Sequence, residues 1–338
     1  MTNFKGKTIL ITGGTGSFGG YFANYLLDKD FNEIRIFSRD ELKQEQMRQR
    51  LSHPKIKFYI GDIRDRDSVD DAMEGVDYVF HAAALKQVPT CEFFPMQATQ
   101  TNVIGSQNVI NSAIQNGVAK VVSLSTDKAV YPVNALGITK ALMEKMIQSV
   151  ARNISERKTI LTLVRYGNVL FSRGSVIPLF MRQIRENKSL TLTEPEMTRF
   201  LLPLPEAIQL VGFALEQGQQ GDTFVRKAHS CTIGDIATAL ISIFCSKSKV
   251  KVIGMRHGEK MHETLISNDE LIRSEDMGGY LRVRMDDRDL NYEKYLSEGK
   301  QELGQLQDYN SQNANRLSIQ EIKELLMAQP EIISALKS

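Results

Sequence analysis

Short apolar runs alternate with longer amphipathic stretches through the first half of the chain. The runs at 7–12 and 120–124 are rich in β-branched and aliphatic residues, as strands buried on both faces are. Further strands are predicted at 33–38, 57–60, 76–81 and 159–165, with helices between them. Repeated strand–helix alternation is typical of an α/β fold with a doubly wound parallel sheet of Rossmann type.

After residue 166 the strict alternation ends, and shorter strands and helices predict a smaller C-terminal lobe. We expect a nucleotide-binding domain over 1–166, a substrate-binding lobe over 167–285 that is interleaved with it, and an extended tail over 286–338. The tail is polar up to about residue 315, and a helix is predicted at 319–327. Such a polar segment is expected to dock on a neighbouring subunit. A homo-oligomer with exchanged tails is therefore predicted, with a hexamer as one candidate.

A glycine-rich turn separates the first predicted strand from the first helix. The glycines recur at every third position, which lets the backbone turn tightly and approach a pyrophosphate at the helix N-terminus. A dinucleotide cofactor is the interpretation that this position in the chain favours over an ordinary turn. The contacting residues predicted here are Gly13, Thr15, Gly16, Ser17, Phe18 and Gly19.

Charged residues after the second strand bear on which cofactor is bound. Arg39 and Lys43 would suit the 2′-phosphate of NADP, whereas a carboxylate at this strand end would suit the ribose of NAD. Asp40 complicates the choice, and a solvated helix start is the alternative. NADP is predicted. Asp62 is placed to accept from adenine or to cap the following helix. Further cofactor contacts are expected from Ile63, Ala82, Ala83, Lys86 and Asn102.

The stretch STDKAVYPVNALGITK at 125–140 holds the candidate chemistry. It follows a buried strand and leads into a helical pattern predicted at 141–150. Lys140 and position 136 are four residues apart and share a helix face. In short-chain dehydrogenase/reductases this is the place of a catalytic Tyr-x-x-x-Lys pair, but Leu136 stands where the tyrosine would be. Thr126, Asp127 and Lys128 supply an acid and a base at the strand end.

Composition and residue spacing limit the kinds of function that are expected for this protein. The formal charge of +2 gives no electrostatic basis for binding nucleic acid or an anionic membrane. Three scattered cysteines fit reduced thiols, and no apolar run is long enough to span a bilayer, so a cytoplasmic protein is expected. His257 and His262 are five residues apart, a spacing that places them on different helix faces, and no metal site is predicted.

Specific motifs carry a resemblance that runs from about residue 5 to 325. They are TGGTGSFG at 12–19, HAAA at 81–84, ALKQVP at 84–89, CEFFP at 91–95, STDKAVYPVNALG at 125–137, RYGNV at 165–169, RGSVIP at 173–178, MTRF at 197–200, RHGEK at 256–260 and DDRDLNY at 286–292. The chain resembles extended short-chain dehydrogenase/reductases that act on sugar nucleotides. Among them it is most similar to bacterial UDP-N-acetylglucosamine 4,6-dehydratase/5-epimerases of capsule and O-antigen synthesis. That group also has an apolar residue at the tyrosine position.

The resemblance implies a reaction and a set of roles. A hydride leaves carbon 4 of the hexose for NADP, a base removes the proton on carbon 5, and the carbon 6 hydroxyl departs. The hydride then returns to carbon 6, and carbon 5 is inverted. Lys128 would be the base if desolvation and the cation Lys140 lower its pKa, Asp127 the acid, Thr126 a donor to the sugar and Lys140 a clamp on the nicotinamide ribose. UDP-N-acetylglucosamine would be bound by Lys86, Asn168, Val176, Arg199, Arg256 and Glu259, with Lys227 as a further cation.

Other interpretations remain open. A UDP-sugar 4-epimerase shares the fold and cofactor, although it ordinarily depends on the missing tyrosine. A non-catalytic NADP-binding sensor is less compatible with the presence of Asp127, Lys128 and Lys140 together. Asp127 and Lys128 could also simply pair with each other on the surface.

Overall fold

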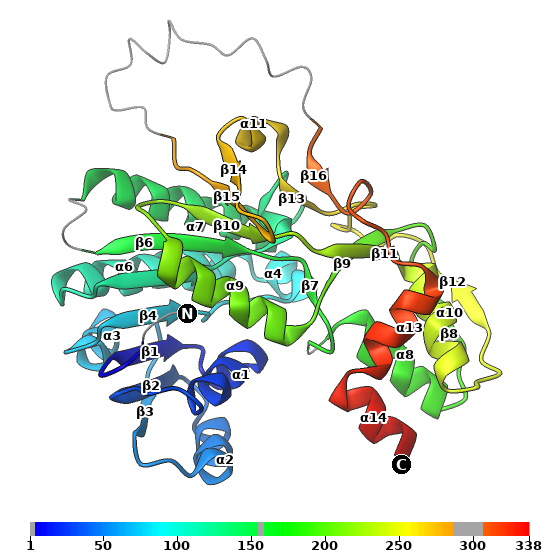
Figure 1. The fold of residues 1–338 in the computed structure, drawn as a ribbon, viewed down its shortest axis with the longest axis horizontal. Coiled ribbons are helices and arrows are strands. Elements are labelled where there is room, and N and C mark those ends of the chain that lie inside the picture. Colours follow the sequence, from blue (N-terminus) through cyan, green and yellow to red (C-terminus); the bar gives the residue numbers. More distant parts are fainter. Residues whose placement is uncertain (1–3, 155–158, 173, 287–306, 338) are drawn as a thin grey trace, which may run out of the picture.

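A nine-stranded sheet forms the centre of the larger body of the molecule and confirms the predicted α/β fold class (Figure 1). The computed structural model describes residues 4–154, 159–172, 174–286 and 307–337. In these residues the strand order is β14-β15-β10-β6-β5-β4-β1-β2-β3. All neighbouring pairs from β10 to β3 are parallel, and β15 and β14 add an antiparallel edge. The strands are β1 (Thr8–Thr12), β2 (Glu33–Ser38), β3 (Ile56–Ile60), β4 (Tyr78–His81), β5 (Lys120–Leu124), β6 (Ile160–Arg165), β10 (Thr223–Arg226), β14 (Ser274–Asp276) and β15 (Tyr280–Val283).

Helices cover both faces of this sheet because successive strand residues point to opposite sides. Ile9 and Ile11 of β1 pack in one apolar cluster with α1 and α9, whereas Leu10 packs in a second with α3, α6 and α7. The helices of this body are α1 (Ser17–Leu26), α2 (Glu41–Leu51), α3 (Arg66–Met73), α4 (Val88–Phe93), α5 (Pro95–Thr99), α6 (Ser106–Gln115), α7 (Ala135–Asn153), α9 (Leu204–Gln217) and α11 (Asn268–Leu271), with a π-helical turn η1 (Gln100–Gly105) and a 3-10 turn η2 (Asp127–Ala129).

The larger body takes in part of the segment assigned to the second lobe. Strand β10 pairs in parallel with β6, joining Thr223 to Leu163, and α9 packs against β5 and β6. Helix α9 and strands β10, β14 and β15, all after residue 166, thus belong to the larger body. The local apolar pattern of these elements carries no information on which sheet they join.

The smaller lobe lies beside the carboxyl ends of the parallel strands (Figure 1). Its apolar core joins α8, α10 and the C-terminal helices, with Phe180, Ile236, Leu240 and Ile322 fully buried. The elements are β7 (Asn168–Val169), β8 (Leu190–Leu192), β9 (Thr198–Leu202), β11 (His229–Thr232), β12 (Val250–Val252), β13 (Thr264–Ile266), β16 (Tyr309–Asn310), α8 (Val176–Arg185), α10 (Ile233–Ile243), α13 (Ile319–Met327) and α14 (Pro330–Lys337).

The described part of the tail, residues 307–337, packs on its own chain, whereas a polar tail was expected to dock on a neighbouring subunit. Strand β16 pairs with β13, and Ser311 is completely buried. Helix α13 packs against α10 through Ile322 and Leu326. Polar side chains here make internal hydrogen bonds, a possibility that composition alone did not reveal. Residues 287–306, where the rest of the predicted exchange falls, lie outside the described residues.

A buried ionic cluster ties the two regions of the larger body together, and its loss should be costly. Arg165 donates to Glu144 at 2.8 Å and to Glu270 at 2.7 Å, and all three residues are buried. Arg165→Met would leave two buried carboxylates without their cation, so we expect a loss of about 3–5 kcal/mol in the free energy of unfolding. Urea unfolding measures it.

The exposed pair of Arg48 and Glu45 on α2 provides the control for this prediction. Arg48→Met should cost less than about 1 kcal/mol, because a surface pair is screened by solvent. Equal losses in the two variants would contradict the assignment of a structural role to Arg165.

Candidate functional site

A large cavity opens at the carboxyl ends of the parallel strands, where ligands bind in doubly wound sheets. Its volume is about 1730 Å³, and its wall is built from both the larger body and the smaller lobe. It brings together most of the predicted site residues. These are Gly13, Thr15, Gly16, Ser17, Phe18, Gly19, Arg39, Lys43, Asp62, Ile63, Ala82, Ala83, Lys86, Thr126, Lys128, Leu136, Lys140, Asn168, Val176, Arg199, Arg256 and Glu259.

The glycine-rich turn forms a cradle at one end of the cavity. Gly13 has a φ of 66°, and a Cβ there would lie 2.8 Å from the Ala83 backbone. A Cβ on Gly19 would lie 2.7 Å from the Gly13 carbonyl oxygen. Helix α1 begins at Ser17 with Gly16 as its N-cap, so no side chain covers its first amides. The close approach and the open helix N-terminus fit the pyrophosphate of a dinucleotide.

The residues around Arg39 form the second part of the predicted cofactor site. The Asp40 carboxylate caps α2 by accepting from the Lys43 amide at 3.0 Å, and it also pairs with the Lys43 ammonium. Asp62 does not cap α3, because Asp65 has that position. Instead the Asp62 carboxylate lies 3.4 Å from the Arg39 guanidinium. The Arg39 side chain is 53% exposed at the cavity wall, where a ligand can reach it.

Two predicted ligand residues do not line the cavity. The buried Asn102 carboxamide accepts from the Leu85 amide at 2.9 Å and donates to Thr139 at 3.1 Å. Asn102 therefore fixes the loop after β4 instead of touching the cofactor directly. Lys227 pairs with Asp276 at 2.7 Å on the surface, so its predicted role toward the diphosphate is not supported.

Helix α7 starts earlier than predicted and presents both Leu136 and Lys140 to the cavity. It begins at Ala135, with the Asn134 side chain accepting from the Gly137 amide at 2.8 Å. Leu136 packs with Cys91 and Ala98, and its position offers no hydroxyl. The Lys140 ammonium donates to the Leu124 carbonyl at 2.7 Å. Burial lowers the pKa of Lys140 to about 8.

Asp127 and Lys128 form an ion pair inside the molecule and not on its surface. The Lys128 ammonium lies 3.0 Å from Asp127 Oδ1, and the Thr126 hydroxyl donates to the same oxygen at 2.8 Å. Thr126 and Lys128 line the cavity, whereas Asp127 is fully buried behind them. The Thr126 hydroxyl, predicted to donate to a sugar, donates to Asp127 here, and Asp127 does not reach the cavity directly.

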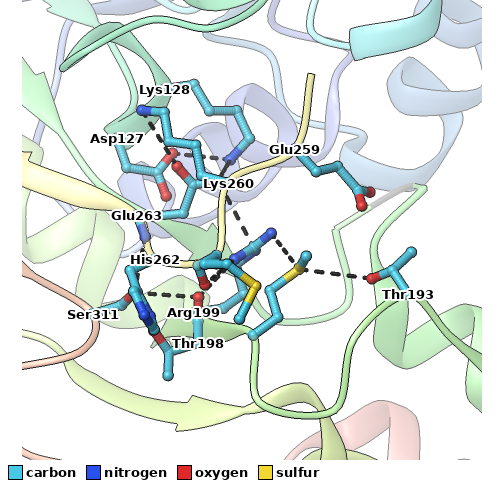
Figure 2. Close-up of polar contacts among 12 residues, drawn as sticks. Asp127, Lys128, Thr193, Thr198, Arg199, Glu259, Lys260, His262, Glu263 and Ser311 are labelled. Carbon is cyan, nitrogen blue, oxygen red and sulfur yellow. Dashed lines mark hydrogen bonds and ion pairs between the residues drawn. The ribbon is translucent and has the colours of Figure 1, made fainter. Parts of the chain in front are cut away.

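Glu263 is a neighbour of Lys128 that sequence analysis missed. Its Oε1 lies 3.3 Å from the Lys128 ammonium, and its side chain lines the cavity. Figure 2 shows both residues. Glu263 is the last residue of the charge-dense segment 255–263, but nothing in that segment indicates that its end folds against residue 128. Only the pairing of β13 with β16 and the packing of β13 against η2 bring it there.

The two carboxylates determine the protonation of this cluster. Burial lowers the pKa of Lys128, but Asp127 and Glu263 outweigh burial and raise it above the ordinary value. The prediction of a lysine made neutral by desolvation and by Lys140 is thus wrong for the resting site. Burial raises the pKa of Asp127. Burial also opposes ionisation of Glu263, yet the cations Lys128, Arg199 and Lys260 lower its pKa overall.

Cations and amides from the smaller lobe complete the wall. Arg199 lies in strand β9, and its guanidinium donates to the carbonyls of Thr198 at 2.7 Å and Met261 at 3.3 Å. Arg256 and Glu259 lie 3.9 Å apart on the loop before β13. Asn168 Oδ1 is buried with no hydrogen-bond partner among the described residues, so it can accept from a ligand.

Two general features of the described residues bear on function. No helix in them is long and apolar enough to cross a membrane. In the same residues, no group of three or more His, Cys, Asp or Glu side chains is arranged to hold a metal ion.

Two family models match the chain in succession. A model described as "Polysaccharide biosynthesis protein" matches residues 9–285. A model described as "Polysaccharide biosynthesis protein C-terminal" matches residues 286–332. The boundary coincides with the start of the predicted tail.

The chain is similar in sequence to named relatives and in fold to solved structures. A Rickettsia felis protein named UDP-glucose 4-epimerase is 57% identical over 96% of each chain. The X-ray structure of Pen from Bacillus thuringiensis is 36% identical and superposes with a TM-score of 0.87, covering 96% of this chain and 99% of that one. DesIV, a dTDP-glucose 4,6-dehydratase from Streptomyces venezuelae with NAD and TYD bound, gives a TM-score of 0.69 at 22% identity over 75% and 86% of the two chains. The DesIV match supports the fold alone.

Proposed function

The chain belongs to the polysaccharide biosynthesis protein family, and we propose that it binds a nicotinamide dinucleotide and acts on carbon 4 of a nucleotide-bound hexose. The cradle around Gly13 supports the cofactor, because a Cβ in it would collide with the Ala83 backbone. The cations of the smaller lobe support a diphosphate, because Arg199 and Arg256 line the same cavity. When bound, the cofactor would accept a hydride from carbon 4 and later return it.

More specifically, we propose a UDP-N-acetylglucosamine 4,6-dehydratase that inverts carbon 5 and supplies surface polysaccharide synthesis. The observation that carries this proposal is the Asp127–Lys128 pair at the cavity wall combined with Leu136. A 4-keto group acidifies the neighbouring carbon 5 proton, so elimination needs an acid–base pair beside the sugar. With Leu136 in place of a tyrosine, Lys128 is a cavity-lining group that can transfer a proton and is also paired with a buried carboxyl group.

Lys128 is the cavity-facing member of the pair and would exchange the carbon 5 proton. Because it rests as an ammonium, it must first release its own proton. Asp127 can receive that proton: its Oδ2 is buried with no hydrogen-bond partner among the described residues, and burial raises its pKa. The neutral amine of Lys128 then accepts the proton from carbon 5. The pair as a whole gains one proton, which is available for the departing carbon 6 hydroxyl.

The name of the Rickettsia felis relative favours a second candidate, a UDP-glucose 4-epimerase. That reaction would use the same cofactor and the same hydride transfer, with the hydride returned to the opposite face of carbon 4. It would need a base for the 4-hydroxyl, and Leu136 cannot provide one. Lys140 lines the same cavity, and because burial lowers its pKa to about 8, it is then a candidate base.

Product analysis by proton NMR separates these candidates. The protein is incubated in turn with UDP-N-acetylglucosamine and UDP-glucose, with either NADP or NAD. A new methyl doublet identifies dehydration, since carbon 6 becomes a methyl group. Conversion to the galacto isomer identifies 4-epimerisation. An unchanged spectrum with both sugars, in protein that binds cofactor, would favour a non-catalytic sensor.

NADP is the proposed cofactor, and Arg39 provides its test. A guanidinium binds a phosphate with charge-assisted hydrogen bonds worth roughly 1.5–3 kcal/mol, so Arg39→Ala should weaken NADP binding about 10- to 100-fold. NAD lacks the 2′-phosphate, and its affinity should change little. Isothermal titration with both cofactors measures the two effects. Equal losses for NADP and NAD would exclude this role for Arg39.

Self-association is proposed through an apolar face on helices α5 and α7. Met96, Ile138 and Leu142 are between 52% and 65% exposed there, and the two helices pack against each other. Exposed apolar side chains on adjoining helices are typical of subunit contacts. The double variant Ile138→Glu with Leu142→Glu should lower the mass measured by light scattering. Met327→Glu, at a side chain 50% exposed on α13, should not. An unchanged mass in the double variant would place the contact elsewhere.

A further inference from the structure

Glu263 lies at the point where the smaller lobe meets the candidate acid–base pair. Its side chain is only 4% exposed, and the Lys128 ammonium lies 3.3 Å from its Oε1. The same ammonium lies 3.0 Å from Asp127 Oδ1. Lys128 therefore contacts a carboxylate from the larger body and another from the lobe (Figure 2). A flexible side chain held at two points has few rotamers left, so its ammonium is fixed in position.

The backbone of Glu263 is held in turn by the C-terminal segment. Its amide donates to Ser311 Oγ at 2.9 Å, and its carbonyl accepts from the Ser311 amide at 2.8 Å. Ser311 is completely buried, and its hydroxyl also lies 2.7 Å from Thr198 Oγ1. Figure 2 shows Ser311 and Thr198 on the side of Glu263 that faces away from Lys128. A residue far along the chain is thus built into the support of the site.

We propose that Glu263 is a positioning residue that fixes Lys128 as an ammonium at the cavity wall, and that the C-terminal segment holds Glu263 in place through Ser311. The inference rests on the proposed function only in taking Lys128 as the proton-transfer group. The C-terminal segment thereby supports the site within its own chain, a role that the predicted exchange of tails between subunits did not include.

The charged side chains around Glu263 determine how its replacement should change the titration of Asp127 and Lys128. Asp127, Lys128 and Glu263 are in direct contact, Arg199 lies 3.9 Å from Glu263, and Lys260 lies 3.8 Å from it. The negative charge of Glu263 raises the pKa of both Asp127 and Lys128. Removing it favours the anionic form of Asp127 and disfavours the ammonium of Lys128. Both groups should therefore titrate at lower pH in Glu263→Gln.

Carbon-13 NMR of full-length protein labelled at the aspartate carboxyl groups tests this without any substrate. Asp127→Asn assigns the Asp127 signal. In Glu263→Gln, the midpoint of the Asp127 titration should move to lower pH. Glu196→Gln, an exposed change outside the cavity, is the matched control and should leave the midpoint unchanged. Glu263→Asp keeps a carboxylate but withdraws it, so it should give a smaller shift in the same direction.

Kinetics provide the second readout. Misplacing a reacting group by about 1 Å can cost on the order of 10²-fold, so turnover of Glu263→Gln should fall by about that factor. The limbs of its pH–rate profile should also move to lower pH. A uniform loss at every pH, or an Asp127 midpoint that is the same in Glu263→Gln, Glu263→Asp and the unmodified protein, would overturn the proposal. If no nucleotide sugar is turned over, the proposed function fails, and the NMR titration still decides the role of Glu263.

Discussion

Lys128→Ala should abolish the exchange of the carbon 5 proton with solvent. Lys128 is the member of the Asp127–Lys128 pair that lines the cavity, and Asp127 is closed off behind it. The variant removes the amine that links Asp127 to the cavity. General acid–base catalysis typically contributes roughly 10²–10⁴-fold, so the exchange rate should fall by that order. Deuterium uptake at carbon 5 from heavy water measures it.

The reduction of bound cofactor serves as an internal control for this variant. In the proposed reaction, hydride transfer from carbon 4 precedes loss of the carbon 5 proton, so it should still be visible by absorbance in Lys128→Ala. Lys145→Ala, a change at an exposed lysine of α7, is the matched control and should exchange deuterium normally. Deuterium uptake at the native rate in Lys128→Ala would show that another group, with Glu263 as the first candidate, is the base.

The central sheet could be predicted because its strands have a local signature. Runs such as TILIT are buried on both faces and are followed by glycine or helix-capping residues, so their order along the chain was clear. The place of β10 was not predictable in the same way. Its sequence, TFVR, fits any short strand, and it joins the large sheet because it pairs with β6 across a long loop of chain. Nonlocal pairing of this kind leaves no periodic signal.

In the site, too, residues with a local sequence signal could be predicted, whereas residues brought in by nonlocal contacts could not. The glycine turn, Arg39 and Lys128 follow strand ends closely in the sequence, and the carboxyl ends of parallel strands meet at one edge. Asn102 was misassigned because a polar residue near this edge can equally support a loop, as its bonds to Leu85 and Thr139 show. Glu263 was missed because its partner Lys128 lies in a distant segment. The charge state of Lys128 depends on that contact and could not be obtained without it.

Lys140 should make the stability of the protein depend on pH in a way that Lys140→Met removes. Burial lowers the pKa of Lys140 from 10.5 to about 8 in the folded chain. Between these values the unfolded chain binds more protons than the folded one, so the free energy of unfolding rises with pH over this window. The cost of burying the charge is fully present below about pH 8 and is lost as the pH approaches 10.5. The difference corresponds to about 3 kcal/mol.

The comparison between variant and unmodified protein isolates this effect. Methionine preserves the length and apolar stem of Lys140 but leaves the Leu124 carbonyl without its donor, a cost of about 1–3 kcal/mol that does not vary with pH. The stability of Lys140→Met relative to the unmodified protein should therefore fall by about 3 kcal/mol between pH 7 and pH 10.5. Urea unfolding at a series of pH values measures it, with Lys145→Met on the exposed face of α7 as control. A constant difference across that range would mean that Lys140 is not a buried ammonium near pH 7, and its proposed role as a charged clamp on the nicotinamide ribose would be lost with it.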